Sequence, residues 1–440
     1  MALSGTDIEM RRHAADTAVH DIEHVLFATL VQIAIIIVAA RVAGYLARRI
    51  GQPRAVGEIV AGLLLGPSLF GSLAPDTFQW VFRSTESAPI SIMSQIGLIM
   101  LMFQIGLEFD FSHIKNKRNK LIVSLVTVAG IVAPFALGLL FGGVSAPHLA
   151  EGIEPKGYAL FLATAFSITA VPVLGRIMME FDLTRTRIGA ITISAAAIND
   201  AIGWTLLAFI SAIVTAHFSL TAMFVRISWL LFYVLVCWLL VRQVLRFIIR
   251  RFDLSSQSLP QDLMAILLVI VFTSAMLTSK LGIFAIFGGF MMGVLLHDQP
   301  ELVAAWKSKV ADLVTVFFLP IFFTYTGLRT DVGGLDSSAL WLWCAVLILL
   351  AVIGKFGGCY WAARLAGLPK PEARNIAIMM NTRALMELIV VNLGYDLGVI
   401  PQNVFTMLVL MAIASTIMTA PGLRAWLPDM GHVIPKGRDA

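Results

Sequence analysis

Asp200 is the residue whose type and surroundings most favour chemistry, because it lies in an apolar stretch. It directly follows Asn199, and apolar residues flank the pair on both sides. A buried carboxylate is tolerated with a proton or a cation bound to it, and it is costly with neither. Competition between proton and cation for Asp200 is the simplest basis for coupled exchange. The alternative is a neutral, hydrogen-bonded aspartate between helices.

Three other ionisable residues lie in apolar stretches. Lys355 is about 13 Å of helix away from Arg364, a depth from which a lysine does not easily reach the interface. We expect the Lys355 ammonium to pair with the Asp200 carboxylate. The alternative is that Lys355 is a purely structural tether. Arg383 and Glu387 are spaced i,i+4 and can pair on one helix face. We interpret this pair as stabilising, with a role in shaping the ion path as the alternative.

Apolar runs long enough to cross a membrane must position these residues. The chain is 58% hydrophobic and 13% charged, with a mean hydropathy of +0.87. Each run of about 20 apolar residues can span the hydrocarbon core as a helix, and the runs lack the alternation of barrel strands. We predict an all-α polytopic membrane protein with about thirteen transmembrane helices. The predicted spans are 24–46, 53–72, 89–109, 119–141, 158–178, 187–215, 222–246, 262–279, 282–297, 308–328, 338–363, 373–396 and 402–423.

The basic residues indicate the orientation. They gather in alternate loops, for example Arg242, Arg246, Arg250 and Arg251 after the seventh span. Loops rich in Lys and Arg face the cytoplasm. We therefore predict an integral protein of the bacterial inner membrane, with the N-terminus outside and the C-terminus cytoplasmic. Residues 1–23 are predicted as an extracytoplasmic tail, 24–425 as the transmembrane domain and 426–440 as a short cytoplasmic tail.

Two pairs of spans indicate an inverted repeat. Residues 55–65 of the second span align with 286–296 of the ninth, with both glycines and the Leu-Leu pair coinciding. Residues 103–110 of the third span align with 324–331 of the tenth. Each pair is an odd number of spans apart, so the copies are inverted, as is typical of secondary transporters. Spans 1–6 and 8–13 are then the two halves, and span 7 links them.

The repeat predicts that the fifth and twelfth spans correspond. In the fifth span, Pro172 removes a backbone donor and clashes with the preceding turn, beside the hydroxyls of Ser167 and Thr169. In the twelfth, Asn381–Glu387 is the most polar stretch inside any span. Freed carbonyls and half-helix ends are suited to holding ions. We therefore predict two crossed, interrupted helices beside the ion site.

Six motifs occur in a specific order across residues 24–425. They are Gly57-Glu58-Ile59…Gly62…Gly66-Pro67-Ser68, Gly106-Leu107-Glu108, Thr169-Ala170-Val171-Pro172-Val173-Leu174, Asn199-Asp200, Thr326-Gly327-Leu328-Arg329-Thr330 and Asn381-Thr382-Arg383-Ala384-Leu385-Met386-Glu387-Leu388. Together they resemble the second monovalent cation:proton antiporter family of the sodium/proton exchanger superfamily. The residues of these motifs are most similar to those of the plant cation/proton exchanger branch and its bacterial relatives.

The resemblance implies a dimerisation domain, a core domain with elevator-like movement, and a homodimer. The family's ion-binding aspartate falls on Asp200, and its buried lysine falls on Lys355. Electrogenic members carry two adjacent aspartates where this chain has Asn199-Asp200, which favours one-for-one, electroneutral exchange. The alternative is that Lys355 also gives up a proton when the cation binds, so that two protons are exchanged. Potassium-efflux members carry a C-terminal nucleotide-binding domain, for which the tail here is too short. We therefore expect no regulation by a nucleotide.

The leading hypothesis is secondary antiport of H+ against Na+ or K+ by alternating access, with the choice of cation open. The predicted site residues are Asp200, Asn199, Thr169 and Val171 for the cation and proton, Lys355 for charge balance, Arg383, Glu387 and Asn381 for the ion path or a structural pair, and Pro172 for the helix break. The alternative is a channel-like potassium efflux pathway without proton coupling. We expect no enzyme, because HExxH, CxxC and GxSxG motifs are absent from the sequence. We also expect no cofactor besides the transported ions, and no nucleic-acid partner.

Overall fold

The computed structural model describes most of the chain, and every regular element in the described residues is a helix. The described residues are 5–83, 88–107, 117–169, 171–183, 186–215, 220–252, 259–281, 285–383 and 385–432. The α-helices are α1 (Gly5–Arg49), α2 (Arg54–Leu65), α3 (Phe70–Leu73), α4 (Pro75–Phe78), α5 (Ala88–Leu107), α6 (Lys117–Leu149), α7 (Pro155–Ser167), α8 (Val171–Glu180), α9 (Arg187–Thr215), α10 (Leu220–Val236), α11 (Arg242–Ile249), α12 (Gln261–Lys280), α13 (Ala285–Leu296), α14 (Pro300–Trp306), α15 (Leu319–Leu328), α16 (Ser338–Val352), α17 (Gly358–Leu365), α18 (Lys370–Met380), α19 (Leu385–Asp396) and α20 (Gln402–Trp426). Five π-helical turns and one 3-10 turn join or continue them, namely η1 (Gln79–Arg83), η2 (Cys237–Val241), η3 (Lys307–Ala311), η4 (Val314–Phe318), η5 (Ile353–Gly357) and η6 (Pro428–Met430).

Helices occupy every predicted span. Among the described residues, nine helices are long and apolar enough to cross a membrane, and a pair bent by 45°, 300–311 with 314–328, makes a tenth. The other predicted spans are interrupted or short. The fifth consists of α7 and α8, the twelfth of α18 and α19, and the ninth of the apolar helix α13. The prediction of about thirteen spans is compatible with this arrangement.

The outer surface of these helices is apolar, as a lipid-facing surface must be. Large hydrophobic side chains are half or more exposed on several helices, for example Leu240, Phe247, Val269, Leu349 and Trp361. A water-soluble protein does not expose apolar side chains so widely. The exposed rows therefore match the hydrocarbon region that the hydropathy predicts.

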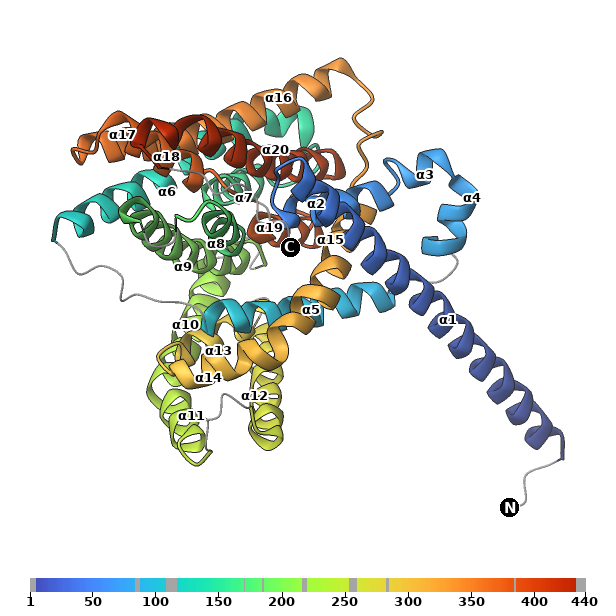
Figure 1. Ribbon diagram of the computed structural model, residues 1–440. Coiled ribbons are helices and arrows are strands. Elements are labelled where there is room, and N and C mark those ends of the chain that lie inside the picture. Colours follow the sequence, from blue (N-terminus) through green and yellow to red (C-terminus); the bar gives the residue numbers. More distant parts are fainter. Residues whose placement is uncertain are drawn as a thin grey trace.

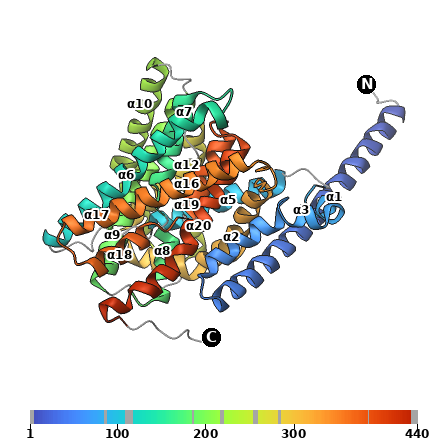
Figure 2. The same cartoon turned by 90° about the horizontal axis from the view of Figure 1, so that it is seen from above.

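Helix α1 begins earlier than predicted. The sequence analysis placed residues 1–23 in a polar tail, whereas α1 is helical from Gly5 onward. The segment 5–23 has no proline, and its one glycine is the first helical residue, so no helix breaker interrupts it although it is too polar to be in the membrane. Figures 1 and 2 show α1 projecting away from the other helices. Hydropathy located the membrane part of this helix but not its start.

The helices form two bundles, which are visible in Figure 1. The core bundle consists of α6–α9 and α16–α20, in which α6 packs on α7, α9 and α17, and α20 packs on α16, α18 and α19. The scaffold bundle consists of α1, α2, α5 and α12–α15, in which α2 packs on α1 and α15, and α13 packs on α5 and α12. Helix α10 contacts α9, and α11 contacts α13, so this segment connects the bundles.

The inverted repeat is visible in the scaffold bundle as two equivalent glycine contacts. Helix α2 packs on α15, and a Cβ atom on Gly62 or Gly327 would overlap the backbone of the facing helix. Helix α5 packs on α13, and a Cβ atom on Gly106 or Gly293 would do the same. The sequence alignment pairs Gly62 with Gly293 and Gly106 with Gly327. The same backbone-to-backbone contact therefore occurs once in each pair of helices, as a pseudo-two-fold repeat requires.

Candidate functional site

Both predicted interrupted helices lie in the core bundle. Helix α7 ends at Ser167 and α8 begins at Val171, while α18 ends at Met380 and α19 begins at Leu385. The two interrupted helices meet where α7 packs on α19.

The first break lies just before the proline that predicted it. Pro172 is the second residue of α8, a position in the first turn where its missing N–H is not needed. It therefore starts the second half-helix, and the non-helical residues Ile168, whose backbone is extended, and Thr169 precede it. The structure describes the backbone of Val171 and Pro172, and Ala170 lies outside the described residues.

The C-terminal end of α7 binds two buried cationic side chains. Lys355 Nζ donates to the Ser167 carbonyl at 2.5 Å, and Arg383 Nη1 donates to the Ala165 carbonyl at 3.1 Å. The last carbonyls of a helix have no partner within the helix and carry the negative end of its dipole. Interrupting α7 in the middle of the bundle thus supplies one backbone acceptor to each of the two buried charges.

A π-helical turn carries Lys355. This turn, η5, continues α16 into α17, and the Lys355 side chain is fully buried in it. Lys355 Nζ also donates to the Gly130 carbonyl of α6 at 2.8 Å. Such turns insert one extra residue into a helix and frequently occur at functional sites. Here the ammonium joins η5 to α6 and α7.

Asn199 belongs to the same polar cluster. In the amide orientation that satisfies both of its ends, Asn199 Oδ1 accepts from Lys355 Nζ at 3.0 Å and from Thr169 Oγ1 at 3.3 Å. Its Nδ2 donates to the Ser167 carbonyl at 3.3 Å. This orientation is assigned from the hydrogen-bond network. The structure thus brings Asn199, Thr169 and Lys355 together at the end of α7.

Asp200 is buried without a protein partner. Its side chain is 1% exposed, and neither carboxylate oxygen has a hydrogen-bond partner in the part of the chain that the structure describes. We expected a direct pair with Lys355, but no ion pair within 4.0 Å joins them among the described residues. The backbone carbonyls satisfy the lysine instead. Buried polar groups are nearly always paired, so an unpaired carboxylate requires a bound proton or cation.

Asn381 is a second buried group without a partner. It caps the C-terminal end of α18, is 0% exposed, and neither atom of its amide has a hydrogen-bond partner among the residues described here. Helix α18 packs on α9, which carries Asp200. Two contacting helices of the core bundle therefore each present an unsatisfied buried oxygen, the ligand type that alkali cations prefer.

Arg383 and Glu387 form the pair that their spacing permits. Both side chains are fully buried, and Arg383 Nη1 donates to Glu387 Oε2 at 3.2 Å. Arg383 Nη2 also donates to the Ala351 carbonyl at 3.1 Å. The guanidinium therefore joins the second break to α7, α16 and α19. Removing one member of a buried pair costs about 3–5 kcal/mol because it leaves an uncompensated charge.

Three hydrogen bonds in this region were not predicted from the sequence. The Gly130 and Ser167 carbonyls hold Lys355, and a backbone acceptor leaves no signal in residue type. Thr382, in the second break, shares a hydrogen bond of 3.0 Å with Thr419 of α20. For the threonines, the polar run around Asn381 was the available signal, but it did not indicate α20.

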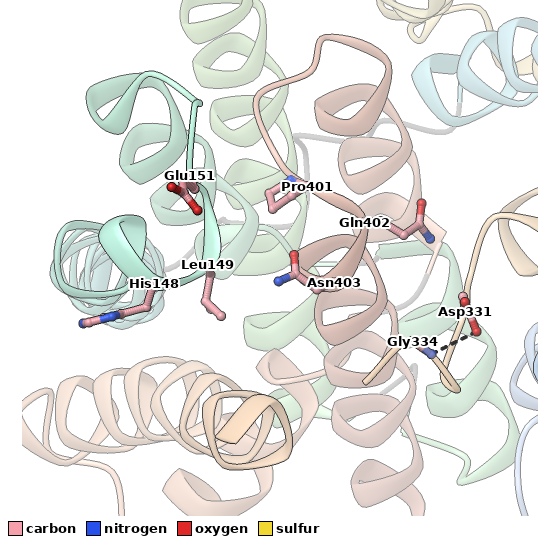
Figure 3. A pocket seen from close by; sticks show the side chains of 8 residues that line it. All are labelled: His148, Leu149, Glu151, Asp331, Gly334, Pro401, Gln402 and Asn403. Carbon is pink, nitrogen blue, oxygen red and sulfur yellow. Dashed lines mark hydrogen bonds between the residues drawn. The ribbon is translucent and has the colours of Figure 1, made fainter. Parts of the chain in front are cut away.

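A surface cavity lies apart from these residues. It has a volume of about 450 Å³ and is lined by polar groups that include Glu151, Asp331, Gln402 and Asn403. Figure 3 shows that its lining comes from the α6–α7, α15–α16 and α19–α20 connections. The Gly334 amide donates to Asp331 Oδ1 at 3.1 Å. None of the site residues predicted from the sequence lines it.

Comparison with known proteins identifies the family. The transmembrane region of the sodium/hydrogen exchanger family matches residues 36–427. The chain belongs to this family. The exchanger is 38% identical over 412 residues to a Na(+)/H(+) antiporter of Synechocystis sp., covering 92% of this chain and 99% of the relative. It is 34% identical over 401 residues to a cation/H(+) antiporter of Arabidopsis thaliana, covering 91% of this chain and 48% of that relative. The chain thus spans about half the length of the plant protein.

The fold of the exchanger is also found in a solved structure. A sodium/proton antiporter from Methanocaldococcus jannaschii superposes with a TM-score of 0.62 at 16% identity, covering 90% of this chain and 99% of that one. At this identity the likeness shows the fold alone. The family predicted from the motifs and the all-helical antiporter fold are both confirmed. With its many apolar helices, the exchanger is a multi-pass integral membrane protein.

Proposed function

We propose that this exchanger is a secondary antiporter that exchanges H+ for a monovalent cation, with Asp200 as the shared site. The observation that carries the proposal is the burial of Asp200 without a partner in the described part of the chain. A carboxylate in this setting holds a proton or a cation, and the two exclude each other. The names of the relatives from Synechocystis and Arabidopsis support the same ions.

The cation ligands follow from the groups around Asp200. A dehydrated cation needs several oxygens, and we infer that Asn199, Thr169 and the backbone at Val171 supply them, together with the unpaired amide of Asn381. Whether the ion is Na+ or K+ stays open, because selectivity depends on sub-ångström geometry and ligand field.

Lys355 takes part through Asn199. Asn199 Oδ1 already accepts from the ammonium at 3.0 Å, so a cation at this oxygen competes with Lys355 for it. We propose that the ammonium balances charge when the site is empty and yields the oxygen when the cation binds. With one titrating carboxylate beside Asn199, the exchange is one proton for one cation and electroneutral.

Alternating access requires movement between the two bundles. The site lies within the core bundle, and secondary transporters expose a midplane site by rocking one bundle against another. We propose that the core bundle moves against the scaffold bundle, in a homodimer of the bacterial inner membrane. The distribution of basic loops supports an outside N-terminus and a cytoplasmic C-terminus.

Proteoliposomes with an imposed pH gradient test the proposal. Na+, K+ or Li+ is added in turn to the wild type and to Asp200→Asn, which keeps the side-chain volume but cannot exchange a proton. Asp262→Asn is the matched control, because this carboxylate is exposed in the first turn of α12. We expect at least one cation to dissipate the gradient in the wild type and the control, and none in Asp200→Asn.

Two other results would contradict the proposal. Cation tracer flux without proton movement indicates the channel-like alternative. A wild type that is silent with every cation across the neutral pH range removes the support for antiport. An exchange rate that does not change when a membrane potential is imposed supports the electroneutral stoichiometry, and a rate that follows the potential rejects it.

A further inference from the structure

Arg329 connects the two bundles. It caps the C-terminal end of α15, in the scaffold bundle. Its Nη1 donates to Asn392 Oδ1 at 3.0 Å, and its Nη2 is bonded to the Asp396 carboxylate. Both acceptors lie on α19, in the core bundle. One guanidinium therefore spans the boundary with two charge-assisted hydrogen bonds.

Aromatic rings hold the same guanidinium from both bundles. It lies 4.7 Å from the ring centroid of Tyr325 on its own helix and 4.9 Å from that of Tyr395 on α19. Cation–π contacts of this kind favour Arg, because its planar group stacks on rings while its edge donates hydrogen bonds. Asp396 and the two rings together fix Arg329 in a single place.

Neighbouring contacts reinforce the connection. Asn392 Nδ2 donates to Thr326 Oγ1 at 2.7 Å, and Gln402 Nε2, at the start of α20, donates to the Arg329 carbonyl. We call Arg329, Thr326, Asn392, Asp396 and Gln402 the Arg329 clasp. Gln402 also lines the surface cavity of Figure 3, so the clasp borders a hollowed face of the molecule.

The two bundles meet around the clasp across a cavity. A space of about 540 Å³ separates α5, α12 and α15 from α19, and Ser94, Tyr325, Asn392 and Asp396 are among its lining residues. The Ser94 hydroxyl is 1% exposed and has no hydrogen-bond partner in the described ranges. By contrast, α15 contacts α2 backbone to backbone through Gly62 and Gly327. Thus α15 is rigidly held by its own bundle, whereas side chains and a cavity separate it from α19.

We propose that the Arg329 clasp is a gate that stabilises one of the two access states of the exchanger. The inference rests on the proposed antiport, because alternating access requires α19 to move relative to α15. The clasp must then break and re-form in every cycle. Arg329 is a positioning residue in this scheme, since it acts on the bundles and not on the transported ion.

Loss of the clasp has a specific signature. The apparent dissociation constant of a ligand equals its intrinsic value divided by the fraction of protein in the competent state. Releasing the clasp lowers the fraction of one access state and raises that of the other. The apparent KM for the cation therefore rises at one face of the membrane and falls at the opposite face.

Oriented vesicles test this expectation with Arg329→Gln, Asp396→Asn and the double variant. Arg187→Gln is the matched control, because Arg187 pairs with Glu372 at 3.4 Å within the core bundle. In each clasp variant we expect the apparent KM for the cation to shift about fivefold, in opposite directions at the two faces. The shift in the double variant should not exceed that in the stronger single variant. A lower maximal rate with unchanged KM at both faces means a structural role and overturns the proposal.

A second readout does not depend on transport. Ser94→Cys is labelled with a water-soluble maleimide, with and without Arg329→Gln, against the background of the three buried native cysteines. We expect the labelling rate to change by about fivefold or more when the clasp is released. An unchanged rate overturns the gate. A changed rate in a protein that exchanges no cation keeps the gate and rejects the proposed antiport instead.

Discussion

At the level of single residues, backbone carbonyls and an amide hold the buried lysine of the core bundle. Lys355 donates to the Ser167 and Gly130 carbonyls and to Asn199, so its charge is satisfied without a carboxylate. Asp200 is therefore left free of a direct ion pair within the described residues. A carboxylate that already carried a strong partner would have less to gain from a transported ion. The separation of the two charges is thus what makes Asp200 available.

Gly130 should control this cluster through its lack of a side chain. A Cβ atom there would lie 3.0 Å from Cys359 Sγ and 3.3 Å from the end of the Asn199 side-chain amide. Gly130→Ala should displace Asn199 and raise the KM for the cation by about tenfold, as loss of a group that orients a ligand does. Gly143→Ala in the same helix is the control, since its Cβ would have no neighbour within 4 Å. Cation-dependent proton movement in proteoliposomes measures both, and equal KM values in the two variants would refute the prediction.

The charged part of the site could be predicted from the sequence, because ionisable residues in apolar runs are rare and costly. Asp200, Lys355 and the Arg383–Glu387 pair were found in this way. The expected Lys355–Asp200 pair was wrong because matching opposite charges ignores the dipole of a helix end. The sequence did not indicate that the Gly130 carbonyl accepts from Lys355, since every residue has a backbone carbonyl.

At the level of elements, the breaks were predictable and the π-helical turn was not. Pro172 and the polar run at Asn381 indicate interruptions by their chemistry alone. The turn η5 instead depends on packing. A Cβ atom on Gly354 would lie 2.8 Å from Pro134 Cα, and one on Gly358 would lie 2.9 Å from the Ala129 carbonyl. Close approach of α6 to this segment positions Lys355, and only the three-dimensional structure shows it.

The two glycine contacts of the scaffold bundle should respond alike to substitution. Gly327→Ala would place a Cβ against α2, and Gly106→Ala would place one against α13. Overpacking of this kind costs about 1–3 kcal/mol. We expect both variants to lower the Tm in detergent by similar amounts, while Gly143→Ala leaves it unchanged or slightly higher. If Ala is tolerated in one pair and not in the other, the two contacts are not equivalent and the pseudo-two-fold relation fails there.

At the level of the whole molecule, hydropathy predicted an all-helical membrane protein but not how its helices are grouped. The aligned glycines showed which spans are related by the repeat. They did not show that α2 packs on α15 and α5 on α13, because partner choice depends on surfaces that complement each other. The division into core and scaffold bundles follows from these contacts, and so does the position of Arg329 between them.

The pH dependence of exchange should differ between the two faces of the membrane. If protons and cations compete for Asp200 as proposed, acidifying the face where the cation binds should raise the apparent KM and leave the maximal rate nearly unchanged. Alkalinising the opposite face removes the protons needed for the return step, so it should lower the maximal rate instead. Exchange measured with each face buffered separately distinguishes the two effects, and varying both faces together should give a bell-shaped profile. A cation KM that does not change with pH would mean that proton and cation bind different groups. The unpaired carboxylate of Asp200 would then not be their shared binding site.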